Sequence, residues 1–206
     1  MKLYDLKPAP NPRRVRIFAA EKGIDLDLVE VDIGAGEHKS PDFLKKHPSG
    51  KIPVLETDDG QFIAESVAIC RYLEALHPEP NLFGATPYEL GRIEMFNRIL
   101  ELELWSQIGI SWVNGPVVAQ MAPGRFKQNP AAKEASDKAV HAFYARLDRE
   151  LGERPYMAGE RFTIADITGL TAVDFAASRV ELPPADDLSN LWAWHERVSA
   201  RPSSTA

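Results

Sequence analysis

Two short segments, separated by an acidic turn, carry the residue types best suited to hold a small zwitterionic ligand. In the first, Lys51 to Leu55, Pro53 stands at the entrance to an apolar strand, where an X-Pro bond can be cis. In the second, Glu65 and Ser66 stand where a strand passes into an apolar helix. A carboxylate, a hydroxyl and the free N–H groups of a helix N-terminus suit a ligand with its own ammonium and carboxylate. Taken alone, the dipeptide could instead be a surface acid followed by a helix cap.

The elements that would position these segments alternate between strands and helices. Gly23 is a helix stop, Ser40 is a candidate N-cap, and Asp58-Asp59-Gly60 is a hairpin signal. The predicted strands cover residues 2–6, 26–33, 54–56 and 62–64, and the predicted helices cover 13–22, a short segment from 41, and 66–76. This β-α-β-α-β-β-α order is the pattern of a thioredoxin-like α/β domain.

Strand signals vanish after a proline-rich segment, and the rest of the chain is predicted to be helical. The segment Pro78 to Gly84 contains two prolines and ends on a glycine, which is typical of a linker. Long helices are predicted over residues 88–118, 131–151, 163–178 and 188–200. Alternating elements followed by helices alone indicate two packed units. We therefore predict a thioredoxin-like domain over 1–77, a linker over 78–87 and an all-helical domain over 88–206.

The composition is that of an ordinary globular protein and excludes several functional classes. Hydrophobic residues make up 44% and charged residues 26% of the 206 positions. A net charge of −6 argues against general binding to nucleic acid or to an anionic membrane. The single cysteine, Cys70, precludes an internal disulfide and suits a reducing compartment, so we expect a cytoplasmic protein. The histidines lack metal-ligand spacing, and no metal is predicted.

Several longer motifs resemble one known family in both their order and their spacing. The chain is similar to the cytosolic glutathione transferase superfamily, of a bacterial type with phi-, theta- and nu-like motifs. The segments that carry this resemblance are Asn11 to Ile17, Glu21 to Ile24, Gly36 to Pro41, Met157 to Asp166 and Trp194 to Ser203. Together they span almost the whole chain.

The resemblance assigns a glutathione site to the two segments described first. In the family, the serine and its adjacent N–H groups hold the γ-glutamyl carboxylate, and the acid lies near the ammonium. These roles map onto Ser66 and Glu65. The backbone before the proline pairs with the cysteinyl part of glutathione, which maps onto Ile52, and Pro53 keeps that backbone accessible.

Three cationic residues are candidates for holding the glycyl carboxylate of glutathione. His38 and Lys39 align with residues that do this in the phi and theta classes, and Lys51 aligns with another. Charge-assisted hydrogen bonds of this kind are the stronger ones. The alternative is a solvated loop that carries ordinary surface charge.

The group that activates the thiol is where this sequence departs from the family. Serine-type classes hydrogen-bond the glutathione sulfur with a hydroxyl, and counting back from Val15 places that position at Ala9. A donor lowers the thiol pKa, and the thiolate is the nucleophile. Asn11 is the remaining candidate catalytic residue, since its amide can donate and the N–H groups of the following helix add positive potential. The alternative is that Asn11 is a helix N-cap.

Other residues with chemical potential are predicted to be structural. Tyr4 lies in a strand, offset from the tyrosine-type position, and Cys70 lies in an apolar helical stripe that predicts a buried, inert thiol. Thr163 and Asp166 have the spacing of a capping box. A solvated helix face, rather than an acidic-ligand site, is predicted for the basic cluster of Arg13, Arg14 and Arg16.

The resemblance implies a detoxifying homodimeric transferase that conjugates glutathione, its co-substrate, to a small hydrophobic electrophile. The active site is expected at the domain junction, with the acceptor pocket lined by the first loop and by helix residues between Leu104 and Met121. Glu101 and Glu103 fall where the family's first long helix can reach the partner's glutathione, and neither is assigned. Because Ala9 removes the usual hydroxyl, two alternatives stay open: glutathione-dependent disulfide or peroxide reduction, and a glutathione-binding module with little turnover.

Overall fold

The computed structural model describes residues 1–121, 123–124 and 126–206. The chain divides into two compact units, one formed by Met1–Phe83 with Pro202–Ala206 and the other by Gly84–Arg201. This division does not test the predicted domain limits of 1–77 and 88–206, which stay a prediction. Among the described residues, no helix is long and apolar enough to cross a membrane.

The first unit contains a mixed four-stranded sheet in the order β2-β1-β3-β4. Its strands are β1 (Lys2–Asp5), β2 (Asp27–Glu30), β3 (Val54–Glu56) and β4 (Phe62–Ala64). Strand β2 runs parallel to β1, whereas the β1–β3 and β3–β4 pairs are antiparallel. The predicted thioredoxin-like arrangement is therefore confirmed.

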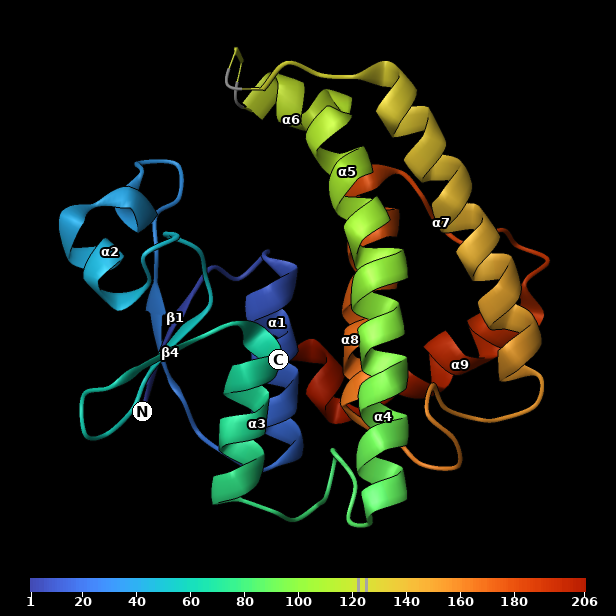
Figure 1. Ribbon diagram of the computed structural model, residues 1–206, viewed down its shortest axis with the longest axis horizontal. Helices are drawn as coiled ribbons and strands as arrows, with labels where there is room; N and C mark the ends of the chain where they lie inside the picture. The colour runs from blue at the N-terminus through green and yellow to red at the C-terminus, as the bar shows by residue number, and fades with distance from the viewer. Residues whose placement is uncertain (122, 125) are drawn as a thin grey trace. The chain divides into compact units, whose positions relative to one another are not determined.

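Helices cover both faces of this sheet. Figure 1 shows α1 (Pro10–Glu21) and α3 (Ser66–Leu76) together on one face and α2 (Pro41–Lys46) on the other. Ser40 caps α2 as predicted, because its side chain accepts a hydrogen bond from the Phe43 N–H. Two short 3-10 segments, η1 (Glu37–Lys39) and η4 (Pro202–Thr205), complete the unit.

Alternation along the strands decides which side chains meet each helix layer. Leu3 pairs with Leu55, and Tyr4 pairs with Val54, so each pair shares a face and successive pairs face opposite ways. Tyr4 packs edge-on against Phe43 of α2, with ring centroids 5.9 Å apart. Leu3 and Leu55 are fully buried on the opposite face, which α1 and α3 cover.

Within its described residues, the second unit consists of helices joined by loops and contains no strand. Helix α5 packs along α7, α4 packs against α8, and α7 contacts α9. The elements are α4 (Pro87–Ile99), η2 (Leu100–Trp105), α5 (Ser106–Asn114), α6 (Pro116–Met121), α7 (Pro130–Leu151), α8 (Ile164–Phe175), η3 (Ala176–Val180) and α9 (Ser189–Ser199). Segments η2 and η3 are π-helical continuations of α4 and α8.

The helix predicted over 88–118 is interrupted at Gly115, where the prediction was wrong. Gly115 adopts an extended conformation with ψ of 168°, and α6 begins anew at Pro116. The cause is local, because a proline disfavours the helical conformation of the residue before it and has no N–H to donate.

The predicted capping box at the start of α8 is confirmed. The Thr163 N–H donates to Asp166 Oδ2 at 2.9 Å, and Asp166 is fully buried. The other carboxylate oxygen accepts from the Met157 N–H at 2.8 Å and from Trp194 Nε1 at 2.9 Å. Asp166 therefore has the structural role predicted for it, and it joins α8 to α9 and to the segment before α8.

Candidate functional site

The register of the sheet brings the two candidate segments together. Val54 of β3 pairs with Ala64 of β4, so one further step along each chain places Pro53 beside Glu65. Val54 also pairs with Tyr4 near the end of β1, which places the first loop at the same end of the sheet. The start of β3, the end of β4 and the end of β1 therefore meet at one site.

The backbone of Ile52 is open to hydrogen bonding, whereas its side chain packs against the core of the first unit. The Ile52–Pro53 bond is cis, as predicted. The Ile52 side chain packs against the buried cluster of Val31, Phe43 and Val54. Its N–H and C=O make no hydrogen bond within the described residues. A partly buried, anchored side chain with an unbonded backbone suits main-chain pairing with an extended peptide ligand.

Ser66 accepts a hydrogen bond from a buried arginine, Arg14, that was predicted to lie on a solvated helix face. Arg14 of α1 is only 2% exposed, and its Nη1 donates to Ser66 Oγ at 2.7 Å. Arg16 is buried too, donating to Asp5 and to the Lys7 carbonyl. The predicted solvated face is therefore wrong for both arginines.

Helical spacing contained the signal that was missed. Residues 14, 15, 18, 19 and 22 recur at the spacing of one helix face, and all five are buried. Arg14 and Lys22 thus belong to the same stripe as Val15 and Phe18. Their charge suggests that both side chains are exposed to solvent. Their position on the stripe instead predicts that they are buried, with a polar partner for the guanidinium and for the ammonium group.

Glu65 adopts a strained conformation at the start of α3. Its φ is 65° and its ψ is 113°, outside the regions that a residue with a Cβ ordinarily occupies. Such strain costs on the order of 1–3 kcal/mol and tends to occur at functional sites. The side chain is exposed and has no hydrogen bond or ion pair within the described residues. Its carboxylate is therefore open to a ligand.

The His38-Lys39 turn packs against the loop that precedes Pro53. Lys39 Nζ donates to the Ser49 carbonyl at 2.7 Å. Gly50, with φ of 54°, lies so close to the His38 carbonyl that a Cβ would clash with it. His38 is buried, whereas Lys51 is exposed and has no hydrogen bond within the described residues. The structure thus brings the three predicted glycyl-end residues to adjoining loops.

Asn11 supplies hydrogen-bond donors in the first loop, near the end of β1. Helix α1 begins at Pro10 with Ala9 as its N-cap, so the alternative that Asn11 is the N-cap is wrong. Pro10 and Pro12 have no N–H, and the Arg13 N–H donates to the Ala9 carbonyl at 3.2 Å. Asn11 is exposed, and its amide makes no hydrogen bond within the described residues.

Two other potential thiol-chemistry groups are occupied or buried. The Tyr4 hydroxyl donates to Glu56 Oε2 at 2.6 Å. Burial, together with the Glu56 carboxylate, raises the pKa of Tyr4 to about 12. Cys70 is fully buried in α3, as predicted. Neither group is available to activate a bound thiol.

In the helical unit, the acids on η2 form pairs within the chain. Arg98 donates to Glu101 at 3.1 Å, and Arg146 donates to Glu103 at 2.6 Å. Nearby, Trp105 and Trp112 pack against Phe175, with ring centroids 5.8 and 5.3 Å apart. Both tryptophans lie in the segment between Leu104 and Met121, where the acceptor pocket is expected.

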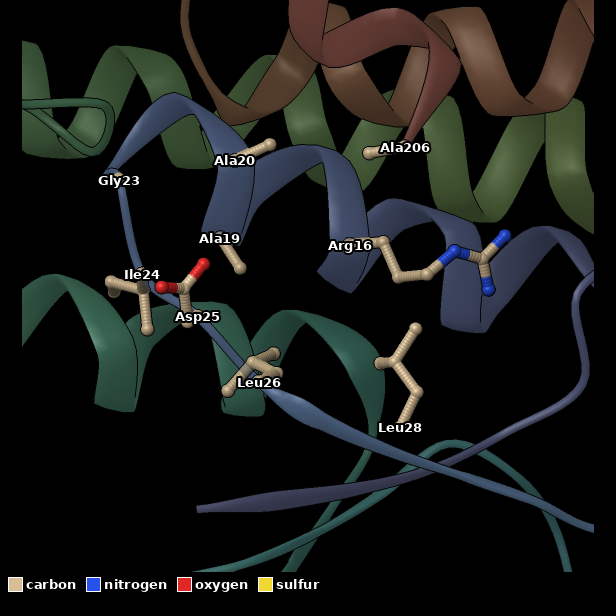
Figure 2. Close-up of a pocket in the computed structure, with 9 residues that line it drawn as sticks. All are labelled: Arg16, Ala19, Ala20, Gly23, Ile24, Asp25, Leu26, Leu28 and Ala206. Carbon is tan, nitrogen blue, oxygen red and sulfur yellow. The ribbon is translucent and has the colours of Figure 1, made fainter.

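A separate hollow of about 340 Å³ lies in the first unit between α1 and β2 (Figure 2). Its apolar lining includes Ala19, Ile24 and Leu28. Arg16 and Asp25 are the charged residues of this lining. None of the predicted glutathione-binding residues lines this hollow, which is therefore distinct from the candidate site.

Two family models match this chain. The glutathione S-transferase N-terminal domain matches residues 9–76, and the glutathione S-transferase C-terminal domain matches residues 111–202. The chain is 40% identical to glutathione S-transferase 2 of Saccharomyces cerevisiae, covering 98% of this chain and 87% of that one. It is 33% identical to human glutathione S-transferase theta-2, covering 95% and 79%.

Solved structures agree with these sequence matches. A glutathione S-transferase domain-containing protein of Marinobacter aquaeolei superposes with a TM-score of 0.91 at 38% identity, covering 98% of this chain and 99% of that one. Gtt2 of Saccharomyces cerevisiae superposes with a TM-score of 0.90 at 39% identity, covering 98% of each chain.

Proposed function

Because this chain belongs to the glutathione S-transferase family, we propose that it conjugates glutathione to a small hydrophobic electrophile through a stabilised thiolate. The chain is a transferase, and enzymes of its family use glutathione as co-substrate. The observation that carries the finer proposal is the meeting of Ile52-Pro53, Glu65-Ser66 and the first loop at one end of the sheet.

Each part of the tripeptide has a complementary group in this arrangement. Ser66 and the N–H groups at the start of α3 bind the γ-glutamyl carboxylate, and Glu65 binds the ammonium. The unbonded Ile52 backbone pairs with the cysteinyl residue, while Pro53 sets the entrance of β3. Lys51 and His38 bind the glycyl carboxylate. Lys39 contributes there through the loop contact that it makes with Ser49.

The chemical step needs the glutathione thiol as a thiolate. The thiol proton leaves to solvent, the thiolate sulfur attacks the electrophilic carbon, and a carbon–sulfur bond forms as the leaving group departs or the acceptor bond opens. Asn11 stabilises the thiolate through its side-chain amide and its own N–H, since Pro10 and Pro12 supply no donor. The acceptor varies widely on this scaffold, so the fold alone does not identify it.

Replacing Ser66 by alanine should weaken glutathione binding by about 1.5–3 kcal/mol, the range for a hydrogen bond to a charged group. The variant leaves the γ-glutamyl carboxylate one donor short. Titration calorimetry of both proteins with glutathione measures the difference. Ser178→Ala is the matched control, because that hydroxyl is exposed and donates to the Asp174 carbonyl of its own helix.

Equal affinities of wild type and Ser66→Ala would reject this assignment of the carboxylate site. Absence of binding to the wild type would reject the proposed function itself. Thermal unfolding of both proteins shows whether the variant keeps the native fold, because Ser66 is buried and its oxygen accepts from Arg14.

Replacing Asn11 by alanine should raise the pKa of bound glutathione toward the free cysteine value of about 8.5, because the site loses an amide donor. Ala9→Ser should lower that pKa. Ala9 is the N-cap of α1, in the first loop, so a serine hydroxyl there adds a donor to the sulfur. Thiolate absorbance against pH for the three proteins measures the shifts, and conjugation to a model electrophile should follow the same order.

If Asn11→Ala matches the wild type in both thiolate pKa and rate, Asn11 does not stabilise the thiolate. The sulfur must then be held by the backbone or by another residue. Wild-type conjugation should be modest at neutral pH and should increase toward alkaline pH.

The alternative of glutathione-dependent disulfide or peroxide reduction would have to use the thiolate of bound glutathione rather than a protein thiol. Cys70 is the single cysteine of the chain, and it is fully buried in α3. A thiolate must be accessible to attack a disulfide sulfur. Conjugation by bound glutathione requires no protein cysteine.

The homodimer and the cytoplasmic, detoxifying role belong to the same proposal. Tyr88 and Met95, seven residues apart, lie on one face of α4 and are exposed, and Leu102 of the π-helical η2 is exposed as well; we call these three residues the apolar stripe. We assign this stripe to contact with a second copy of the chain. Sedimentation velocity should show a species of about twice 22.9 kDa, and a single species at 22.9 kDa would contradict the dimer.

A further inference from the structure

We propose that Arg14 is a positioning residue that directs the Ser66 hydroxyl proton toward the γ-glutamyl carboxylate and so makes the site selective for ligands that carry this carboxylate. The proposal rests on the proposed function, because it concerns the same glutathione site. It adds a buried cation behind the residue that contacts the ligand.

The first step of the argument is the direction of one hydrogen bond. An arginine guanidinium can only donate, so the 2.7 Å contact between Arg14 Nη1 and Ser66 Oγ makes the serine oxygen the acceptor. The serine proton must then be donated elsewhere. Ser66 is 6% exposed, and within the described residues its hydroxyl donates to no acceptor.

The second step is the set of groups that surround this proton. Ser66 is the first residue of α3, an eleven-residue helix, and the N–H groups of its first turn are donors like Arg14. A hydroxyl proton among donors needs an acceptor from outside the chain. The charged guanidinium and the positive end of the helix dipole both favour an anionic acceptor, and a carboxylate meets both requirements.

The third step is the position of Arg14. Because it is 2% exposed, its charge is little screened by water, and it can act on Ser66 more strongly than a surface arginine could. Arg14 itself need not touch the ligand. Its contribution should therefore disappear with the ligand carboxylate or with the Ser66 hydroxyl.

The test compares two ligands and a small set of variants by titration calorimetry. The ligands are glutathione and 4-aminobutanoyl-cysteinylglycine, which is the same tripeptide without the γ-glutamyl α-carboxylate. Arg14→Met should weaken glutathione binding at least tenfold and leave the analogue's affinity unchanged. Adding Arg14→Met to Ser66→Ala should cause little further loss, because the two residues act through one hydrogen bond.

Arg13→Met is the matched control. Arg13 lies next to Arg14 on α1, but its Nη2 donates to the Ser204 carbonyl at 3.0 Å, so its loss should change neither ligand's affinity. Should Arg14→Met fail to fold, Arg14→Gln replaces it. Glutamine keeps a hydrogen-bond donor but lacks the positive charge. The Arg14→Gln variant should therefore still show a reduced preference for glutathione over the analogue.

The possible outcomes separate this inference from the proposed function. Wild-type protein that binds neither ligand would reject the proposed glutathione site. Wild-type protein that prefers glutathione, with Arg14 variants that keep the same preference, would overturn the role of Arg14 alone. Equal weakening of both ligands would also overturn it, because Arg14 would then support only the structure of the site.

Discussion

The protein in which Asp166 is replaced by alanine should lose about 3–5 kcal/mol of unfolding free energy, the cost of breaking a buried charged network. The carboxylate accepts hydrogen bonds from the N–H groups of Met157 and Thr163 and from Trp194 Nε1, at 2.8–2.9 Å. Each of these donors would be left buried without its acceptor, which is the expensive case. Urea unfolding followed by tryptophan fluorescence measures the loss, with circular dichroism as a second probe.

The ionisation of Asp166 should also give stability an unusual dependence on pH. Burial raises the pKa of Asp166 to about 6, above the value of about 3.9 for an exposed aspartate. Between these two values the folded protein holds a proton that the unfolded chain has lost. The free energy of unfolding should therefore fall as pH rises from about 4 to about 6, by up to about 3 kcal/mol from this residue, and then level off.

Asp166→Asn separates the charge from the hydrogen bonds. Asparagine keeps one acceptor oxygen, so its loss of stability should be smaller than that of Asp166→Ala, and its stability should lack this pH-dependent step. Burial also raises the pKa of Asp5, but both proteins contain Asp5, so its contribution cancels in the difference. Asp186→Ala, at an exposed position, should match the wild type. Parallel pH profiles of wild type and Asp166→Asn would contradict the raised pKa.

The parts of the site that lie on regular elements could be predicted from the sequence. Residues 54–56 and 62–64 are strands as predicted, and Ser66 begins α3 as predicted. The limits of these strands are fixed by their apolar alternation and by the Asp58-Asp59-Gly60 hairpin signal between them. A shift of the strand register by one residue would move every apolar side chain to the wrong face. The convergence of Pro53 and Glu65 then follows from the register alone.

The limits of α1 could not be predicted, because the apolar pattern is not what starts this helix. The pattern indicates a helix from residue 13, whereas α1 begins at Pro10. Proline at the first helical position lacks only an N–H that would be unbonded anyway, so Pro10 and Pro12 are both tolerated in the first turn. The shift moves the N-cap from Asn11 to Ala9 and leaves Asn11 open to a ligand.

The buried cations are the second class of residue that sequence patterns missed. Arg14 and Lys22 lie on the apolar stripe of α1, yet charge normally predicts exposure. What allows their burial is a set of partners far away in sequence. Arg14 donates to Ser66, and Lys22 donates to carbonyls that follow α3. No local pattern in α1 reports those partners.

Lys22→Met should destabilise the first unit by about 3–5 kcal/mol, the same range as for Asp166→Ala. Removing one partner of a buried ion pair leaves the other charge uncompensated, and the acceptors of the lost ammonium lose their donor. The Lys22 side chain is fully buried and pairs with Glu74 of α3. Its ammonium also donates to the carbonyls of His77 and Pro80, at 2.8 and 2.6 Å. Lys22 thus binds the C-terminal end of α3 and the segment that follows this helix.

A second variant distinguishes the lost charge pair from the lost carbonyl contacts. Lys22→Met with Glu74→Leu removes both charges and should recover part of the stability, since an apolar pair can replace a buried ion pair. The recovery should be incomplete, because the carbonyls of His77 and Pro80 still lack their donor. Lys2→Met, at the exposed pair with Glu56, is the control and should change stability little. If Lys22→Met unfolds at the same urea concentration as the control, the ammonium does not hold α1, α3 and the following segment together.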